Sequence, residues 1–313
     1  MHTKYIEGLV SVVIPTYKRS EMLRRAINSV LSQTYTDVEC IVVNDNTPGD
    51  EFSLLLYKMV DEYNNEGRFH FVEQAVHKNG AAARNAGIRI AKGEYIAFLD
   101  DDDFWDNNKL EIQIGVLQSL PSEWGAVSCL MKLYHNGKVF SANRPYKDGY
   151  IHYEVLTRSI SMGTGSLVIR RSALDETGYF DENLRRFQDP QLFSCLTEKY
   201  KVRLVKKYLH NRDVDDAQNR PTIETINAYQ EAFYKSVAPQ LERLSKRKVK
   251  LLKVIFNFDK VPILWKSGNK RQTINCMLNV LKYPEAIIFA YKRIWERYAN
   301  RIGINSRMAK YKA

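Results

Sequence analysis

Apolar positions follow two different spacings along the first hundred residues of the chain. Short runs of β-branched and other apolar residues predict buried strands at residues 10–14, 39–43, 69–72 and 95–99. Apolar residues at three- and four-residue intervals predict amphipathic helices at residues 22–31, 52–63 and 81–91. Strands that alternate with helices in this way predict an α/β fold built on a parallel, doubly wound sheet.

Two residues set the expected ends of the first elements. Pro15 should end the first strand, because proline has no N–H to donate to a β-ladder. Ser20 is suited to cap the helix that follows, since its hydroxyl can accept a hydrogen bond from the first helical turn.

Polar residues follow three of the predicted strands, at the edge where a doubly wound sheet binds its ligands. They are Thr16 and Tyr17, Asn44 and Asp45, and the run from Asp100 to Asp103. No GxGxxG motif follows the first strand, and no GxxxxGK[ST] motif occurs anywhere. A dinucleotide-binding or P-loop fold would therefore lack the turn that grips phosphate.

Four consecutive aspartates, Asp100 to Asp103, stand between a buried strand and the aromatic pair Phe104 and Trp105. Adjacent carboxylates repel one another, and burying them costs several kcal/mol unless a cation is present. A solvated acidic loop is one interpretation. The apolar residues on both sides favour another, in which the carboxylates and substrate phosphates hold Mg²⁺ or Mn²⁺.

Composition describes a globular protein with an uneven charge. The 313 residues are 44% hydrophobic and 27% charged, with a net charge of +11. Residues 241–313 hold 18 Lys and Arg against four Asp and Glu, whereas the first 240 residues hold 29 against 32. The chain thus divides into a slightly acidic body and a strongly basic C-terminal region, which we expect to have different roles.

Several classes of protein are disfavoured by simple counts. No run of 18 apolar residues predicts a transmembrane helix, and the short polar N-terminus does not resemble a secretory signal. The four cysteines are widely scattered, so neither a CxxC zinc site nor a disulfide scaffold is expected. These features predict a cytoplasmic protein with reduced thiols.

Three segments, in order, carry a resemblance to a known family. They run from Val10 to Tyr17, from Ala83 to Gly87 and from Gly93 to Asp103. Together with residues 163–170, residues 178–182 and the pair Gln188 and Asp189, they resemble the inverting family 2 glycosyltransferases of the GT-A fold. The resemblance covers about residues 9–215. It implies a GT-A domain at residues 1–220, with a Rossmann-like, mostly parallel sheet flanked by helices, and a basic helical extension at residues 221–313.

The resemblance implies a nucleotide-sugar site at the strand ends. The loop at Pro15, Thr16 and Tyr17 would lie against the nucleotide, and Asp45 would recognise the base. Many members of the family have two aspartates where this chain has Asn44 and Asp45.

The remaining donor-site residues follow from the same resemblance. Arg84 would lie near the nucleotide, and Asp100 and Asp101 would begin the DxD motif. Asp101 would hold the ribose or sugar, and Asp102 would bind the Mn²⁺ or Mg²⁺ ion. Asp103 matches a further acid that is frequent in the family.

The resemblance also places a general base and a second metal ligand. Asp189 would be the base, although Gln188 stands where the family usually has glutamate. Taken alone, Asp189 is better interpreted as an acid at a helix N-terminus, since Pro190 at the first helical position suits a cap at Asp189. His210 would be a C-terminal metal or phosphate ligand, and a structural histidine is the alternative.

The expected reaction is a single, inverting transfer. Asp189 would take the proton of an acceptor hydroxyl as that oxygen attacks the anomeric carbon of a donor such as a UDP-sugar. Gln218 to Pro221 lack the tryptophan of the motif carried by processive members, so one addition is expected. The acceptor would be a glycan or a lipid-linked saccharide of bacterial surface-polysaccharide synthesis. Candidates for its binding site are Trp105, Met162, Gly163, Thr164 and Phe187.

The basic C-terminal region interleaves Lys and Arg with apolar residues. Ile287, Ala290, Tyr291 and Ile294 recur at helical spacing beside Lys292 and Arg293. Such a helix suits an anionic membrane surface, where each basic residue contributes about 1 kcal/mol, and would place the protein at the inner face of the cell membrane. A helix packed on the body with a solvated basic face is the alternative.

Two other functions share parts of this pattern. A nucleic-acid binder could use the basic region, but no reading module is recognisable and the acidic strand ends would repel phosphates. A sugar nucleotidyltransferase would share the α/β domain but should carry a glycine-rich loop after the first strand, where this chain has residues 15–19 without glycine.

Overall fold

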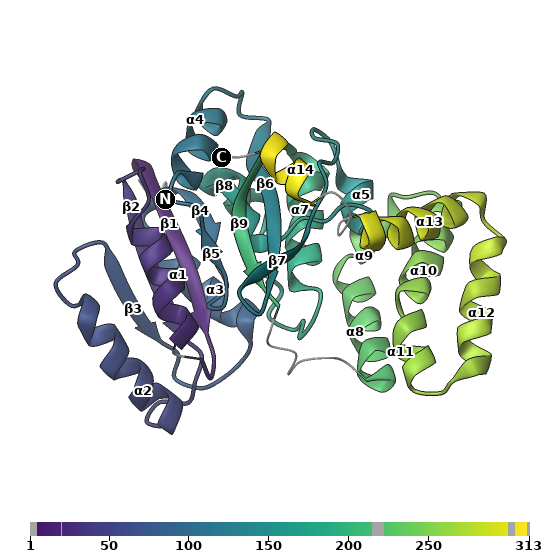
Figure 1. The fold of residues 1–313 in the computed structure, drawn as a ribbon, viewed down its shortest axis with the longest axis horizontal. Helices are drawn as coiled ribbons and strands as arrows, with labels where there is room; N and C mark the ends of the chain where they lie inside the picture. Colours follow the sequence, from purple (N-terminus) through teal and green to yellow (C-terminus); the bar gives the residue numbers. More distant parts are fainter. Residues whose placement is uncertain (1–4, 20, 215–221, 300–303, 312–313) are drawn as a thin grey trace.

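The structure is a computed structural model that describes residues 5–19, 21–214, 222–299 and 304–311. These residues form a sheet body and a layer of C-terminal helices beside it (Figure 1). Ser20, the expected cap of the first helix, lies outside the described residues, as does the expected boundary between residues 220 and 221.

The first half of the body contains the predicted alternation of strands and helices. Its strands are β1 (Ile6–Thr16), β2 (Val38–Asn44), β3 (Phe69–Glu73) and β4 (Gly93–Phe98). Its helices are α1 (Glu21–Leu31), α2 (Glu51–Val60) with the 3₁₀ turn η1 (Asp61–Tyr63), and α3 (Gly80–Ile90). Strands β3, β2, β1 and β4 lie side by side in that order and all are parallel, so this part of the prediction is confirmed.

The second half of the body extends the same sheet with mixed pairing. Its elements are β5 (Phe104–Trp105), α4 (Lys109–Gln118), β6 (Trp124–His135), β7 (Lys138–Ala142), α5 (His152–Leu156), η2 (Thr164–Ser166), β8 (Leu167–Arg170), α6 (Arg171–Thr177), α7 (Gln188–Lys199) and β9 (Lys201–Asp213). Strand β8 is antiparallel to both β4 and β6, and β5 is antiparallel to β9. The sheet therefore continues through β8, β6 and β9 to β5.

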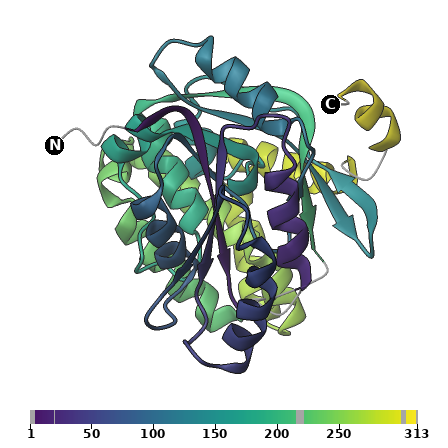
Figure 2. The ribbon, with the colours of Figure 1, turned by 90° about the vertical axis from the view of Figure 1, so that its left-hand side faces the viewer.

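Alternate residues of the central strands face opposite sides of the sheet, and both sides are buried. Val12 and Ile14 of β1 pack in one apolar cluster with Leu23 and Ile27 of α1. Val13 packs in a second cluster with Ala83 and Ile88 of α3 and with residues of α6 and α7. Helices on both faces of the sheet are visible in Figure 2, and they explain why these strands are apolar at nearly every position.

Strand β1 runs through Pro15 to Thr16, so the expected stop at Pro15 is wrong. The carbonyl of Val13 points toward β4 and accepts from the N–H of Leu99. Backbone groups two residues apart in a strand point to the same side, so the nitrogen of Pro15 also points toward β4. The β4 ladder has already ended at Phe98, opposite Val13. No ladder bond there requires the N–H that proline lacks, so Pro15 can continue its pairing with β2 opposite Val43.

The C-terminal region is helical, as expected from the basic composition and the family resemblance. Its helices are α8 (Ile223–Ser236), α9 (Ala238–Glu242), α10 (Lys246–Asp259), α11 (Val261–Lys266), α12 (Lys270–Leu281), α13 (Pro284–Ala299) and α14 (Ile304–Lys310). Phe233 and Phe256 of this layer pack with Leu156 of the body. Helix α14 returns to the sheet, where Met308 packs beside β6 and β9 (Figure 1).

Candidate active site

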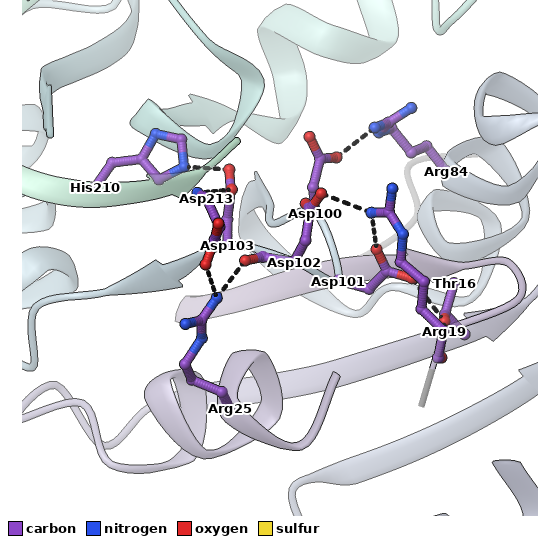
Figure 3. Close-up of polar contacts among 10 residues, drawn as sticks. All are labelled: Thr16, Arg19, Arg25, Arg84, Asp100, Asp101, Asp102, Asp103, His210 and Asp213. Atoms are coloured by element: carbon purple, nitrogen blue, oxygen red, sulfur yellow. Dashed lines mark hydrogen bonds and ion pairs between the residues drawn. The ribbon is translucent and has the colours of Figure 1, made fainter. Parts of the chain in front are cut away.

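The three polar strand ends meet at one edge of the sheet, as the topology predicts. Thr16 ends β1, Asn44 ends β2, and Asp100 follows β4, and β1 lies between the other two strands. Thr16 donates from its hydroxyl to Asp101, at 2.8 Å, which joins the first strand end to the acidic run. Figure 3 shows the four aspartates with the cations that surround them.

Each aspartate of the run has different partners. Arg84 of α3 pairs with Asp100, while Arg19 donates to Asp101 at 3.0 Å and to Asp102 at 2.6 Å. Asp103 turns the other way, accepts from the backbone N–H of Asp213 and lies 2.7 Å from His210 Nε2. The cluster is therefore held by residues of α3, β9 and the loop after β1.

Burial and mutual repulsion control the charge of this cluster. Burial raises the pKa of Asp101 to about 6, against the opposing effect of Arg19. Burial and the charges of Asp103 and Asp100 raise the pKa of Asp102 to about 7. Although burial acts against it, the Arg84 and Arg212 cations lower the pKa of Asp100. The arginines thus offset only part of the repulsion, and a further cation would stabilise the ionised carboxylates.

The acidic run contains a set of oxygens suited to a divalent cation. One ligand oxygen from each of Asp100, Asp102 and Asp103 lies within 4.8 Å of the others. Carboxylate oxygens are the ligands that Mg²⁺ and Mn²⁺ prefer, so these residues fit the expected ion. Asp102 of the predicted metal site is among them.

His210 lies beside this set and touches it through Asp103. Burial, with the Lys109 and Arg212 cations, lowers the pKa of His210 to about 3, so the imidazole is neutral. Its Nδ1 is buried without a hydrogen-bond partner in the structure. A neutral imidazole can bind metal, and the expected ligand role of His210 stays a prediction.

A buried layer beneath the acids fixes the position of His210. A Cβ atom at Gly165 would lie 2.6 Å from His210 Nε2, so only glycine allows the imidazole this close. Trp105 donates from its indole nitrogen to the Gly165 carbonyl at 2.8 Å and is 3% exposed. Trp105, and likewise the buried Thr164, therefore contribute to the core rather than to an open acceptor surface.

Lys109 is the most unusual member of this layer. Its side chain is fully buried, its Nζ has no hydrogen-bond partner in the structure, and that atom lies 3.7 Å from the centre of the Trp105 ring. Burial lowers the pKa of Lys109 to about 8. The aromatic face offsets part of the cost of desolvating the cation.

The expected base-recognition residue, Asp45, lies with the loop between β3 and α3. Its carboxylate accepts from the Gln74 side chain and the Lys78 backbone N–H and lies 3.1 Å from His77 Nδ1. The Tyr17 ring stacks on His77 with 4.1 Å between centroids and is 40% exposed. These residues form an aromatic and acidic corner beside the acidic run.

Asn44 makes two hydrogen bonds that an aspartate at this position could not donate. The Asn44 amide donates to Ser53 Oγ at 3.0 Å and to Glu73 Oε1 at 3.1 Å. An aspartate here could donate neither bond and would place a second carboxylate against Glu73.

Asp189 lies at the start of α7, where two pockets meet. The larger pocket, of 470 Å³, and the smaller one, of 210 Å³, both include Asp189, Pro190 and Arg158 in their walls. Two of the expected acceptor-site residues also line them, Phe187 in the larger pocket and Met162 in the smaller.

Asp189 lies in the first turn of α7, as the alternative of an acid at a helix N-terminus expects, but the cap position predicted for it is wrong. Helix α7 begins one residue earlier, at Gln188, and Phe187 occupies the N-cap position without a side-chain hydrogen bond to the helix. Gln188 accepts from Arg84 at 3.2 Å, and Arg84 also pairs with Asp100, so the first turn of α7 is connected to the acidic run.

Sequence reasoning missed several residues that complete the site. Arg25 donates to the Asp102 carbonyl and pairs with Asp213 at 3.2 Å, and Arg19 holds two of the acids. Arg212 and Asp213 directly follow His210 and Asn211 on β9. The resemblance singled out His210 on that strand but gave no role to the residues that follow it.

Comparison with known proteins identifies related sequences. The model of the family described as Glycosyl transferase family 2 matches residues 11–178, which are slightly more than half of the chain. The putative teichuronic acid biosynthesis glycosyltransferase TuaG of Bacillus subtilis is 38% identical over 199 residues, covering 61% of this chain and 73% of that protein. UDP-Glc:alpha-D-GlcNAc-diphosphoundecaprenol beta-1,3-glucosyltransferase WfgD of Escherichia coli is 29% identical over 175 residues, covering 53% of this chain and 62% of that protein.

The curated relatives differ in length from this chain. An uncharacterized glycosyltransferase of Rickettsia bellii is 31% identical over 195 residues, which are 62% of this chain but 27% of that protein. The chain thus spans between about a quarter and about three quarters of these relatives.

Solved structures share the fold. TarS 1–349 of S. aureus, in complex with UDP-GlcNAc, matches with a TM-score of 0.63 at 17% identity. The match covers 97% of this chain and 91% of TarS 1–349. The mannosyltransferase PcManGT of Pyrobaculum calidifontis, in complex with GDP-Man and Mn²⁺, has a TM-score of 0.57 at 16% identity, with coverages of 96% and 86%. The predicted GT-A fold with a helical C-terminal region is confirmed.

Replacing Lys109 by methionine should stabilise the protein at neutral pH and remove a pH-dependent part of its stability. The pKa of Lys109 is lowered from 10.5 to about 8 on folding, so the unfolded chain binds more protons between these values. Wild-type stability should therefore gain up to about 3 kcal/mol from this group as the pH rises from 8 to 10.5.

Denaturant unfolding at several pH values measures this effect. The advantage of Lys109→Met over wild type should shrink across the same interval. Lys58→Met, at an exposed position on α2, is the control and should give a difference that does not vary with pH. A constant advantage of Lys109→Met would contradict the expectation.

Proposed function

The chain belongs to glycosyl transferase family 2, and from this premise we propose that it transfers a sugar from a nucleotide-sugar to a hydroxyl group of a saccharide acceptor. The observation that carries the proposal is the position of the carboxylates. A set of three stands at the carboxyl ends of the parallel strands, and a separate one, Asp189, opens into two pockets.

We assign the donor to the strand ends. Thr16, Asp45 and the exposed Tyr17 would contact the nucleoside, and Asp101, held by Thr16 and Arg19, would orient the ribose or sugar. Pro15 keeps the backbone of this loop extended at the end of β1. Arg84, already paired with Asp100, lies close enough to the acids to attract a diphosphate.

We assign an Mn²⁺ or Mg²⁺ ion to Asp100, Asp102 and Asp103, with His210 beside them. The ion would neutralise the negative charge that develops on the leaving diphosphate. The mannosyltransferase neighbour, which was solved with GDP-Man and Mn²⁺, supports this assignment.

Asp189 would act as the general base. It would accept the proton of the acceptor hydroxyl while that oxygen attacks the anomeric carbon from the face opposite the leaving diphosphate. A direct displacement with a single base inverts the configuration at that carbon. Gln188 is neutral and next to it, so it adds no second carboxylate that would repel the ionised base.

A UDP-sugar is the donor that we favour, and a lipid-linked saccharide the acceptor. The name of the Escherichia coli relative includes both a UDP-sugar and a diphosphoundecaprenol-linked sugar, and one neighbour was solved with UDP-GlcNAc. The residues behind the expectation of a single addition, Gln218 to Pro221, lie outside the described residues.

We also propose that the C-terminal helices bind the inner face of the cell membrane. None of the helices in the described ranges is both long and apolar enough to span a bilayer. Ten of the seventeen large hydrophobic side chains that are exposed in the described residues lie on α11, α12 and α13. They are Trp265, Ile274, Met277, Leu278, Leu281, Ile287, Ile288, Tyr291, Ile294 and Trp295.

The structure separates two faces of α13. Ala286, Phe289 and Ala290 pack inward against α10 and α12, whereas Tyr291 and Trp295 stack on each other and are 65% and 52% exposed. Exposed lysines on the same helices, such as Lys270 of α12 and Lys292 of α13, supply positive charge. Aromatic residues and lysines together suit the boundary between lipid headgroups and acyl chains.

Asp189→Asn should lower kcat by about 100-fold or more, because asparagine cannot accept the proton. Nucleotide-sugar binding should be unchanged. The measurement is release of the nucleoside diphosphate in the presence of acceptor, and a nucleotidyltransferase would release pyrophosphate instead. Glu198→Gln, which makes the same chemical change at the other end of α7, should retain activity. Full transfer by Asp189→Asn would remove the base assignment.

Chelation with EDTA should abolish turnover, and Mn²⁺ or Mg²⁺ should restore it. Asp102→Asn should weaken Mn²⁺ binding by at least about 10-fold, since it replaces a charged ligand oxygen with a neutral one. The electron paramagnetic resonance signal of free Mn²⁺ reports this binding without turnover. Asp61→Asn, at an exposed acid in η1, is the control. Turnover that persists in EDTA would contradict the metal assignment.

Anionic vesicles should sediment the protein at low salt, and high salt should weaken that binding by screening the lysines. Replacing Tyr291 and Trp295 together by alanine should reduce the bound fraction several-fold. The matched control replaces Leu54 and Leu55, two exposed leucines on α2, by alanine. Absence of binding at both salt concentrations would rule out the membrane proposal.

A further inference from the structure

The larger pocket at Asp189 is formed jointly by the body and the C-terminal helices. The body contributes Arg84, Arg158 and residues 185–190, and the helices contribute residues of α8, α10 and α11 and the linking Lys260. Its 470 Å³ is large enough for one or two sugar-sized groups.

The wall of this pocket is strongly cationic. It contains five cations, Arg84, Arg158, Arg185, Arg186 and Lys260, and two carboxylates, Asp189 and Asp259. Arg158 pairs with Asp259 at 3.1 Å and stacks over the ring of Phe187, so this pair holds the floor of the pocket in place. The net charge of the wall remains positive after that pair is set aside.

The ammonium group of Lys260 is partly removed from solvent without a carboxylate of the described residues bound to its Nζ. Its side chain is half-buried, and its Nζ donates to the neutral amide of Asn227 at 2.7 Å. A partly desolvated ammonium is destabilised unless an anion accompanies it. The Lys260 side chain would therefore gain from an anionic ligand in this pocket.

The two pockets differ in chemistry while sharing Asp189. The smaller pocket is walled mainly by neutral residues, among them Val155, Met162 and Phe193. An acceptor hydroxyl has to reach the Asp189 carboxylate, so the acceptor must occupy the place where the pockets join. One side of that place suits a neutral group and the other side suits an anion.

The donor does not account for the cationic wall. The residues that line the larger pocket include none of Asp100 to Asp103, and neither Asp45 nor the loop at residues 15–19. Arg84 is the one residue that the larger pocket shares with the donor site described above.

We propose that Arg185, Arg186 and Lys260 bind an oxyanion of the acceptor, a phosphate or a carboxylate, and thereby position its hydroxyl at Asp189. This inference rests on the proposed transferase function. It assigns the helices α10 and α11 a second role, because the residue that joins them forms part of the acceptor site.

The test compares three acceptors that carry the same alkyl chain and sugars of the same configuration. One is the neutral alkyl glycoside, the second carries a phosphodiester between sugar and chain, and the third is the corresponding uronate. Wild-type kcat/KM should favour one of the two anionic acceptors over the neutral one by about 10-fold or more, as expected for charge-assisted hydrogen bonds. Which anion is preferred distinguishes phosphate from carboxylate.

Two variants test the cations one at a time. Arg185→Gln, at an exposed position, and Lys260→Gln should each raise KM for the preferred anionic acceptor by about 10-fold. Both should leave kcat/KM for the neutral acceptor and KM for the donor unchanged. Lys266→Gln, on the exposed side of α11, makes the same change outside the pocket and should behave as wild type.

Slow hydrolysis of the nucleotide-sugar without acceptor separates the two levels of the proposal. If neither the wild-type protein nor any variant hydrolyses any nucleotide-sugar, the proposed transferase function is contradicted. If hydrolysis is normal but anionic and neutral acceptors react equally, the acceptor inference is overturned. It is also overturned if Arg185→Gln and Lys260→Gln raise KM for the donor instead, because the pocket would then hold the donor diphosphate.

Discussion

The repulsion among four consecutive carboxylates is the constraint around which this molecule is arranged. Strand β4 is buried on both sides and delivers Asp100 to Asp103 to a single edge of the sheet, so the charges cannot separate. Cations from the loop after β1 and from α3 offset part of that repulsion, and β9 supplies His210 and the backbone N–H that Asp103 needs. The elements that converge on the acids are far apart in the sequence, so the sheet has to be complete before the site exists.

The parallel half of the fold and the polar strand ends could be predicted from the sequence because both depend on local patterns. Apolar runs define β1 to β4, and parallel strands necessarily bring Thr16, Asp45 and Asp100 to one edge. The mixed half could not be predicted in the same way. Strand β8 is only four residues long, and β9 changes its register against β6, so neither carries a distinct periodic signal.

The errors at Pro15 and at the start of α7 have one physical origin. A local rule assumes the usual surroundings, whereas the ladder beside Pro15 has already ended, and Phe187 takes the cap position in a left-handed conformation with φ of 63°. The proposed role of Asp189 likewise depends on its surroundings, since the pockets that meet there are formed by residues from distant parts of the chain. Family resemblance supplied that residue where physical reasoning from the sequence alone favoured a cap.

Because α14 returns to the sheet, the helical layer is joined to the body at both of its ends. The backbone N–H of Tyr208 on β9 donates to the carbonyl of Tyr311, just after α14, and the two rings meet edge to face. Helices α8 to α13 are thus an insertion anchored at both ends on the same strand, rather than an appendage joined by one hinge. A loop closed in this way loses much of its freedom to swing, so the layer can flex only while the separation of its two anchor points is preserved. A protein domain fused directly after Tyr311 would therefore begin beside β9.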